Sequence, residues 1–527
     1  MKNKTNLLYT LLLLLIIVTP NILQSQSTIS KDHLQNQNKE TSGIIFPRPF
    51  AFAIDDLGWN IGNNDGWGEN NGPYRIGINR NMGIRDYRAL VNIANKIPVR
   101  LQTLFIMGEM DRENVLAKYP TTNPLGDKWD NSENVCDEQL EIMEYVVQNA
   151  AYIEFGIHGV LHEYWEVPGK RSRAEWYNID EDKPWPTNII LDHITCFKEI
   201  MGQYGITKEN GHSFPESFVP CAYAYHWNPD GDVSTSSILN KEGVKFINTL
   251  FQEVSELNPP SEPNGGGIDH GTIAVNRINY GNDWFALSSL PTTPIEDQKS
   301  DIIESHWSNW LAQDEFLQEA TNQKWVNYYN MVQQQEDRFV TRNTEQFYSQ
   351  WFYKKYTTVS ETKYGKVIID NSKMPMDVYD NNLLGNMILK VYLPEGKHIS
   401  KATIDGNNIA GYYEDDNYGI LVLPLLNNKK HTLDYSIGNN KISTHIWYDG
   451  TYNVYSFSSN NKKTIVNIRL YGTQDIKIVG INEPHNVSIS NPNIKQINKQ
   501  YDTKDKTLTL TLSALDMQGE SGEIKIW

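Results

Sequence analysis

The stretch FAFAIDDLGWN, residues 50–60, places two adjacent acids directly after an apolar run. The run from Phe50 to Ile54 has the composition of a buried strand. Asp55 and Asp56 stand where that strand would end. An isolated acid pair is most often a helix cap or a solvated turn, so the meaning of this pair depends on the sequence around it.

From this strand to about residue 330, strand-like and helical patterns alternate. The expected helices cover residues 86–97, 136–150 and 188–205, and the expected strands cover 99–107, 152–157 and 217–225. Residues 237–251 read as a helix, a turn and a strand, and residues 321–356 as helical. Such alternation predicts parallel strands joined by crossover helices. We therefore expect an α/β fold, a distorted (β/α) barrel, with its site at the carboxyl ends of the strands.

The pattern changes after about residue 365, where short alternating runs are separated by Asn, Gly and Asp. This is typical of all-β sandwich modules. The expected organisation is a signal peptide over 1–27, a linker over 28–45, the barrel over 46–360, a β-sandwich module over 361–440 and a second β module over 441–527.

The N-terminus has the pattern of an export signal. A short basic segment, MKNK, precedes the apolar run Leu7–Val18, which is short for a membrane span. We expect a secreted or periplasmic protein without a membrane span in the mature chain. The formal net charge of −17, with no basic stripe, argues against nucleic acid as a partner.

Histidines also follow apolar, strand-like runs. His158 and His162 stand four residues apart in EFGIHGVLHEYW, residues 154–165, and His306 ends the run in DIIESHW. A carboxylate with two imidazoles is a common ligand set for a divalent metal, zinc above all. Alternatively, the pair forms one face of a helix, and His306 is a hydrogen-bonded structural residue.

In this order, the segments AIDDLGW, HGVLH, FVPCAY, NDW and IIESHW resemble the motifs of the polysaccharide deacetylases of the carbohydrate esterase 4-like group, over roughly residues 46–315. The resemblance implies a distorted (β/α) barrel of the polysaccharide deacetylase type. It also implies Asp55 as the catalytic base, His306 as the catalytic acid, and a divalent metal bound by Asp56, His158 and His162.

The resemblance further implies that Pro220 and Cys221 contact the substrate and that Asp283 orients His306. Two departures from the family pattern stand out. Leu57 follows the acid pair where the family has glycine, and Phe218 stands where an arginine would brace the base. Four aromatic residues flank the motifs and are expected either to stack on sugar rings or to pack in the core: Trp59, Tyr164, Trp165 and Trp307.

The main functional hypothesis is a secreted, metal-dependent hydrolase that removes acetyl groups from a polysaccharide or amino sugar. A glycoside hydrolase on a related barrel is the first alternative. It would pair Asp55 or Asp56 with a further acid, for which the candidates are Glu154, Glu163 and Asp111. A glycan-binding protein without catalytic activity is the second alternative. In all three cases the partner is a carbohydrate.

Overall fold

A computed structural model of the chain describes residues 43–63, 75–251, 259–362, 366–415 and 417–527. The predicted signal peptide and residues 28–42 of the predicted linker lie outside the described residues, so export stays a prediction. Among the described helices, none combines the length and the apolar character needed to cross a membrane.

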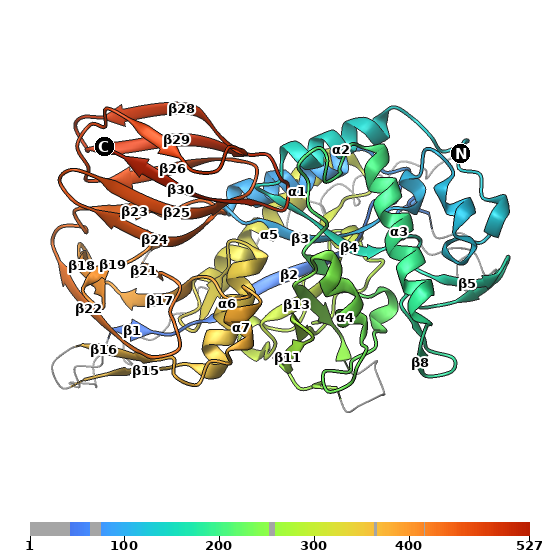
Figure 1. The fold of residues 1–527 in the computed structure, drawn as a ribbon, viewed down its shortest axis with the longest axis horizontal. Helices are drawn as coiled ribbons and strands as arrows, with labels where there is room; N and C mark the ends of the chain where they lie inside the picture. Colours follow the sequence, from blue (N-terminus) through green and yellow to red (C-terminus); the bar gives the residue numbers. More distant parts are fainter. Residues whose placement is uncertain (1–42, 64–74, 252–258, 363–365, 416) are drawn as a thin grey trace, which may run out of the picture. The chain divides into compact units, whose positions relative to one another are not determined.

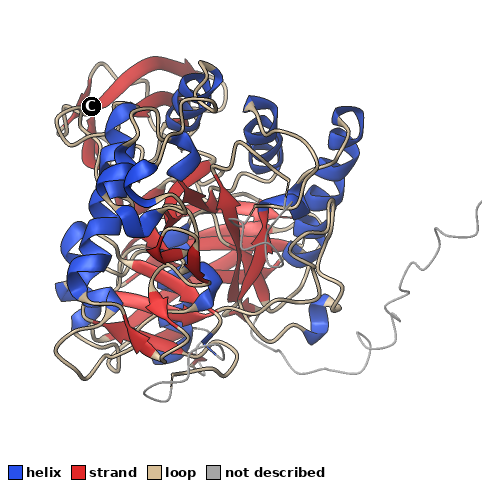
Figure 2. Ribbon diagram, turned by 90° about the vertical axis from the view of Figure 1, so that its right-hand side faces the viewer, coloured by secondary structure: helices blue, strands red, loops and turns tan. Residues whose placement is uncertain are grey.

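A nine-stranded sheet forms the centre of the N-terminal part, with helices packed around it (Figure 2). Its strands, from one edge to the other, are β11 (Gly266–Asp269), β12 (Thr272–Asn276), β10 (Phe246–Thr249), β9 (Ser217–Phe218), β4 (Ile153–Gly159), β3 (Leu101–Ile106), β2 (Arg48–Leu57) and β13 (Ile302–His306), and β14 (Arg338–Val340) also pairs with β2. Only β11 runs antiparallel to its neighbour in this sheet. The predicted parallel sheet is thereby confirmed.

The sheet is curled. Ile278, just after β12, forms a parallel bridge with Ile303 of β13. The backbone N–H of Glu304 donates to the carbonyl of Ile278 at 3.1 Å, which links the two strands further. The described residues thus form a mixed α/β structure with a curled sheet. A complete (β/α) barrel of the deacetylase type stays a prediction.

The helices agree with the sequence pattern except in residues 321–356 and in residues 377–380, a short helix where only β structure was predicted. They are α1 (Ile84–Lys96), α2 (Glu138–Gln148), α3 (Thr187–Gln203), α4 (Thr235–Leu239), α5 (Gln318–Gln333), α6 (Thr344–Tyr356) and α7 (Asp377–Asp380). The helical prediction for residues 321–356 is wrong in its middle, because β14 separates α5 from α6. The reason is tertiary: Phe339 and Val340 are buried, and their strand pairs with β2.

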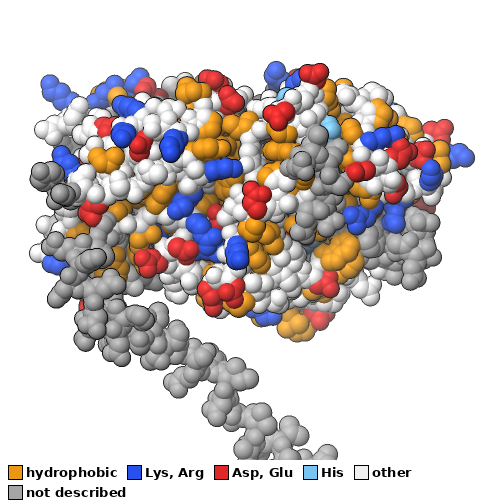
Figure 3. Space-filling view, turned by 90° about the horizontal axis from the view of Figure 1, so that it is seen from below, with side chains coloured by type: hydrophobic (Ala, Val, Ile, Leu, Met, Phe, Trp, Pro, Cys, Tyr) orange, Lys and Arg blue, Asp and Glu red, His pale blue; other side chains and the backbone are white. Residues whose placement is uncertain are grey.

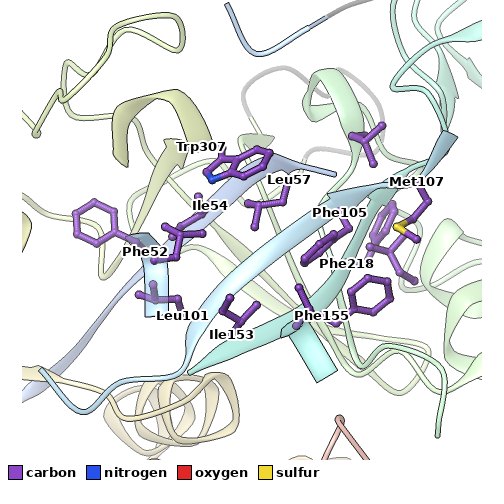
Figure 4. Close-up of a cluster of buried hydrophobic side chains, with 14 of the residues drawn as sticks. Phe52, Ile54, Leu57, Leu101, Phe105, Met107, Ile153, Phe155, Phe218 and Trp307 are labelled. Carbon is purple, nitrogen blue, oxygen red and sulfur yellow. The ribbon is translucent and has the colours of Figure 1, made fainter. Parts of the chain in front are cut away.

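Apolar side chains of β2, β3 and β4 form the core that holds the strand ends in place (Figure 4). The rings of Phe105 and Phe155 lie 4.6 Å apart, centroid to centroid. Trp307, immediately after β13, is fully buried and packs at 4.9 Å on Tyr87 of α1. Such close packing fixes the strands against one another, and with them the side chains at their carboxyl ends.

The C-terminal part consists of β-sheets, as predicted (Figure 1). An eight-stranded sheet contains β1 (Ile44–Ile45), β17 (Met387–Tyr392), β21 (Tyr418–Leu423), β20 (Gly411–Asp415), β23 (His445–Trp447), β26 (Thr473–Val479), β29 (Thr507–Ala514) and β28 (Ile494–Asp502). Strands from both sides of residue 440 share this sheet, and the module boundary predicted there stays a prediction.

Two smaller sheets accompany it. One contains β15 (Thr358–Glu361), β16 (Val367–Asp370), β22 (Lys430–Gly438), β18 (His398–Ile404) and β19 (Asn407–Asn408), and the other contains β24 (Asn453–Ser459), β25 (Thr464–Leu470), β30 (Glu520–Ile526) and β27 (Val487–Ile489). Two short hairpins follow β4, namely β5 (Tyr164–Val167) with β6 (Lys170–Ser172) and β7 (Tyr177–Asn178) with β8 (Lys183–Pro184). On the face in Figure 3, charged side chains of both signs lie among apolar and polar atoms.

Candidate active site

The two adjacent acids reach one site because β2 ends in a bulge. The register between β2 and β3 shifts between Ile54 and Leu57, and Asp56 has a left-handed backbone with φ of 71°. On a regular strand, neighbouring side chains point to opposite faces. The bulge re-aims Asp56. A left-handed conformation in a residue other than glycine is energetically unfavourable and concentrates at functional sites.

Asp55 forms a buried ion pair with Arg277, which follows β12. The two guanidinium nitrogens donate to the two carboxylate oxygens at 2.9 and 2.6 Å. Burial alone would raise the pKa of Asp55, but Arg277 and the nearby His158 hold it below its usual value. Asp55 is therefore ionised at neutral pH. Arg277 was not among the residues predicted from the sequence, although it directly follows the buried run TIAVN, residues 272–276.

The two histidines lie together at the end of β4 and are not on a helix. Their rings are 5.3 Å apart, and His162 has a left-handed backbone with φ of 69°. His158 Nδ1 lies 2.8 Å from the carbonyl of Val219, and its Nε2 lies 3.4 Å from Asp56 Oδ1. A carbonyl on one ring nitrogen fixes the ring so that the other nitrogen is presented to the site.

Buried donor atoms of the kinds that bind metals converge here. One ligand atom each of His158, His162 and Cys221 lies within 4.8 Å of the other two. Asp56 reaches this group through its contact with His158. Imidazole, thiol and carboxylate donors in a dry site fit zinc. The resemblance implied substrate contact for Cys221, whereas the fold places its sulfur beside the two histidines.

His306 and Glu304 complete the site from β13. His306 pairs in register with Asp55, and Glu304 pairs with Ala53. His306 Nε2 lies 3.9 Å from Asp56 Oδ2, and its Nδ1 lies 3.7 Å from Glu304 Oε1. The hydroxyl of Tyr223 donates to the same Glu304 oxygen at 2.8 Å. Glu304 was not among the residues predicted from the sequence, although it stands two residues before His306 and strand alternation places both side chains on one face.

One residue implied by the resemblance, Asp283, lies elsewhere than expected. The carboxylate of Asp283 is exposed and accepts from the backbone N–H of Phe285 at 3.1 Å. In the described contacts Glu304, not Asp283, lies beside His306, so the orienting role of Asp283 is corrected. Pro220 accepts from the backbone N–H of Tyr223 through its carbonyl at 3.2 Å, which closes the turn after β9.

Of the two expectations for the aromatic residues that flank the motifs, packing in the core agrees with the structure. Trp59, Tyr164, Trp165 and Trp307 are all buried. Arg75 lies over the ring of Trp59 at 4.5 Å, and Tyr164 stacks on Trp185 at 3.8 Å. Large rings bury much apolar area, and these four do so within the protein. The aromatic residue exposed near the site is Trp284, 37% exposed, whose ring lies 6.2 Å from that of His306.

Of the three further acids weighed from the sequence, one lies at the site. Glu163 Oε1 is 3.6 Å from His162 Nδ1. Glu154 stands near the start of β4 and pairs with Arg100 at 3.0 Å. Asp111 accepts hydrogen bonds from neighbouring groups, Trp129 Nε1 among them at 3.1 Å. Glu154 and Asp111 therefore have structural roles.

No family model matches the chain. No curated protein matches it either. Among solved structures, the chain is similar to the catalytic module of a family 98 glycoside hydrolase from Streptococcus pneumoniae TIGR4, solved in complex with the LewisY pentasaccharide blood group antigen. The identity is 10%, the match covers 91% of this chain and 98% of that chain, and the TM-score is 0.20. The neighbour is a glycoside hydrolase, and neither a family model nor a curated protein supports the deacetylase activity predicted from the sequence, which is corrected and not retained.

Proposed function

We propose that the protein is a carbohydrate-active hydrolase that cleaves glycosidic bonds, with Asp55 and Glu304 as its reacting carboxylates. The observation that carries this proposal is the placement of two buried acids on adjacent parallel strands. Glu304 pairs with Ala53, two residues before Asp55, so both acids lie on one face of the sheet. Most glycoside hydrolases cleave the glycosidic bond with a pair of carboxyl groups.

The two acids have different surroundings, which supports different roles. Asp55 is held ionised by Arg277 and is the carboxylate that activates water. Glu304 is the proton donor to the leaving oxygen. Tyr223 fixes its Oε1, and its Oε2 has no hydrogen-bond partner among the described residues. Glu304 regains its proton from solvent water, and His306, whose Nδ1 lies 3.7 Å from Glu304 Oε1, is placed to relay it.

A divalent metal, zinc by its donor set, belongs to this proposal, with Asp56, His158 and His162 as ligands. A bound zinc ion supplies a Lewis acid for sugar hydroxyls. Trp284 offers an exposed indole near His306 for the apolar face of a sugar ring. Export by a signal peptide over 1–27 would bring the enzyme to extracellular glycans.

The proposal predicts separate effects on chemistry and on metal content. Asp55→Asn and Glu304→Gln should each lower kcat by about 10²–10⁴-fold, since each removes an acid–base group. Zinc content should stay at the wild-type stoichiometry, because neither residue is a proposed ligand. Reducing ends and free acetate released from a panel of acetylated and non-acetylated polysaccharides are the measurements.

Asp434→Asn is the matched control, because its exposed side chain lies on β22 of a C-terminal sheet and its loss should leave kcat unchanged. Release of acetate without reducing ends would contradict glycosidic cleavage. Tight glycan binding with no product of either kind would instead identify a binding protein. Wild-type kcat in Asp55→Asn would remove Asp55 from the mechanism.

A further inference from the structure

Cys221 is a buried thiol placed among the proposed metal ligands. Its ligand atom and one ring nitrogen each of His158 and His162 lie within 4.8 Å of one another, and all three residues are buried. We infer that Cys221 binds the metal through its sulfur, which makes the centre a thiolate–imidazole site selective for zinc-like ions. The inference rests on the metal site of the proposed function.

The backbone explains how the sulfur reaches the histidines. Phe218 of β9 pairs with Ile157 of β4, and the N–H of Val219 donates to the carbonyl of Ile157 at 3.0 Å. The carbonyl of Val219 then contacts His158 Nδ1 at 2.8 Å. Cys221, two residues further on, lies close enough for its sulfur to approach the carbonyl of His158 at 3.1 Å. The same short segment therefore orients one ligand and carries another.

The segment is held in an unusual conformation directly after the thiol. Ala222 and Tyr223 both have left-handed backbones, with φ of 53° and 64°. Left-handed non-glycine residues are energetically unfavourable and cluster at functional sites. The turn joins two parts of the site, because Tyr223 holds Glu304 while Cys221 lies beside the histidines.

Two other roles for Cys221, a disulfide bond and simple packing in the core, have less support. All three cysteines of the chain are free, so Cys221 forms no disulfide. A thiol that only fills apolar space would not need polar neighbours. The sulfur of Cys221 has the carbonyl of His158 at 3.1 Å and Glu175 Oε2 at 4.0 Å.

A sulfur ligand changes which metals the site accepts. Thiolates favour zinc and cobalt over magnesium, calcium and manganese, which prefer oxygen ligands. A metal ion deprotonates a coordinating thiol outright. The centre should therefore retain zinc in a large excess of magnesium, and replacement of the sulfur by a hydroxyl should weaken zinc binding by at least about tenfold.

Cobalt substitution of the full chain tests the inference by spectroscopy, independently of glycan hydrolysis. The wild-type protein loaded with one cobalt ion should show an intense near-ultraviolet thiolate-to-cobalt charge-transfer band. Cys221→Ser should lose that band while it keeps the weaker visible cobalt bands and binds zinc more weakly. Cys196→Ser is the matched control, because Cys196 is also buried but lies on α3 outside the ligand group, and its band should be unchanged.

X-ray absorption of the wild-type zinc protein covers the case in which Cys221→Ser does not fold. One sulfur at about 2.3 Å supports the inference. Stoichiometric cobalt without the charge-transfer band overturns the sulfur ligand but leaves the nitrogen and oxygen ligands of the proposed function intact. Failure to bind cobalt or zinc overturns both. A charge-transfer band in a protein that cleaves no glycan supports this inference and rejects the proposed function.

Discussion

At the scale of single residues, Gly58 controls how the chain leaves β2 after the acid pair. Its φ is +100°, and a Cβ at this position would lie 2.0 Å from the carbonyl oxygen of Ile106. Gly58→Ala should therefore lower the free energy of unfolding by about 3–4 kcal/mol, the sum of backbone strain and a steric clash. Chemical denaturation measures the change.

Gly169→Ala measures the backbone strain alone, without the steric clash. Gly169 has φ of +79°, but no atom lies within 4 Å of the point that an added Cβ would occupy. Gly169→Ala should lower the free energy of unfolding only by the strain of a left-handed alanine, about 1–2 kcal/mol. Equal losses in the two variants would show that the contact with Ile106 does not constrain the end of β2.

Among site residues, local patterns revealed Asp55, Asp56, His158, His162 and His306, each after an apolar run. Arg277 and Glu304 were missed for a different reason. Arg277 joins Asp55 across 222 residues, and no local pattern marks that pairing. Glu304 lies inside β13, where an acid interrupts the apolar run. Its link to the site is visible only in the folded chain, where the hydroxyl of Tyr223 donates to it. A residue that joins the site only through contacts distant in sequence cannot be recognised from the sequence pattern around it.

At the scale of elements, α1 begins with a buried cap. Asp86 accepts from the backbone N–H of Gly83 at 2.9 Å, and Arg80 donates to both of its carboxylate oxygens at 2.9 and 2.6 Å. Asp86→Ala removes the cap and leaves the largely buried Arg80 without its carboxylate. We expect a loss of about 2–4 kcal/mol in the free energy of unfolding.

Lys96→Ala at the other end of α1 is the comparison for Asp86→Ala. Lys96 pairs with Glu319 on the surface, and both side chains are at least one-third exposed. An exposed pair contributes less than about 1 kcal/mol. If the two variants lose the same stability in chemical denaturation, the cap does not define the start of α1.

Periodicity located most elements to within a few residues, as in α1, α3 and β4. It could not locate β14, because residues 338–340 form a strand only by pairing with β2. Nor could it place the bulge at Asp56, which exists only relative to the register of β3. Elements that depend on a partner strand are visible only once the sheet is assembled.

At the scale of the whole molecule, Arg469 joins the C-terminal sheets to the α/β part. It lies on β25 and donates to Glu345 of α6 at 2.8 Å and to Glu216 at 2.7 Å. Burial would raise the pKa of Glu216, but Arg469 and Lys245 hold it below its usual value of 4.5. The ionised form of Glu216 is thus the form that the folded chain stabilises.

The lowered pKa of Glu216 determines how the stability of the fold changes at acid pH. Because the folded pKa of Glu216 is depressed, its contribution is present above pH 4.5 and is lost as the pH falls toward the folded pKa. Arg469→Met should cost about 3–5 kcal/mol at neutral pH and flatten the loss of stability below pH 4.5, measured by denaturation across pH. Lys401→Ala, at an exposed pair with Asp434, should change neither by more than about 1 kcal/mol.

The short strand β1 has a consequence for the order in which the protein is made. Ile44 pairs with Val391 of β17, so the first described strand waits for a partner about 350 residues later in the chain. At about 5–20 residues per second, a ribosome takes roughly 20–70 s to supply that partner. For most of this interval β2 also lacks β13 and β14, its later neighbours. Nascent chains of this protein therefore expose unpaired strand edges for most of their synthesis, and such edges can pair with other chains until the sheet is complete.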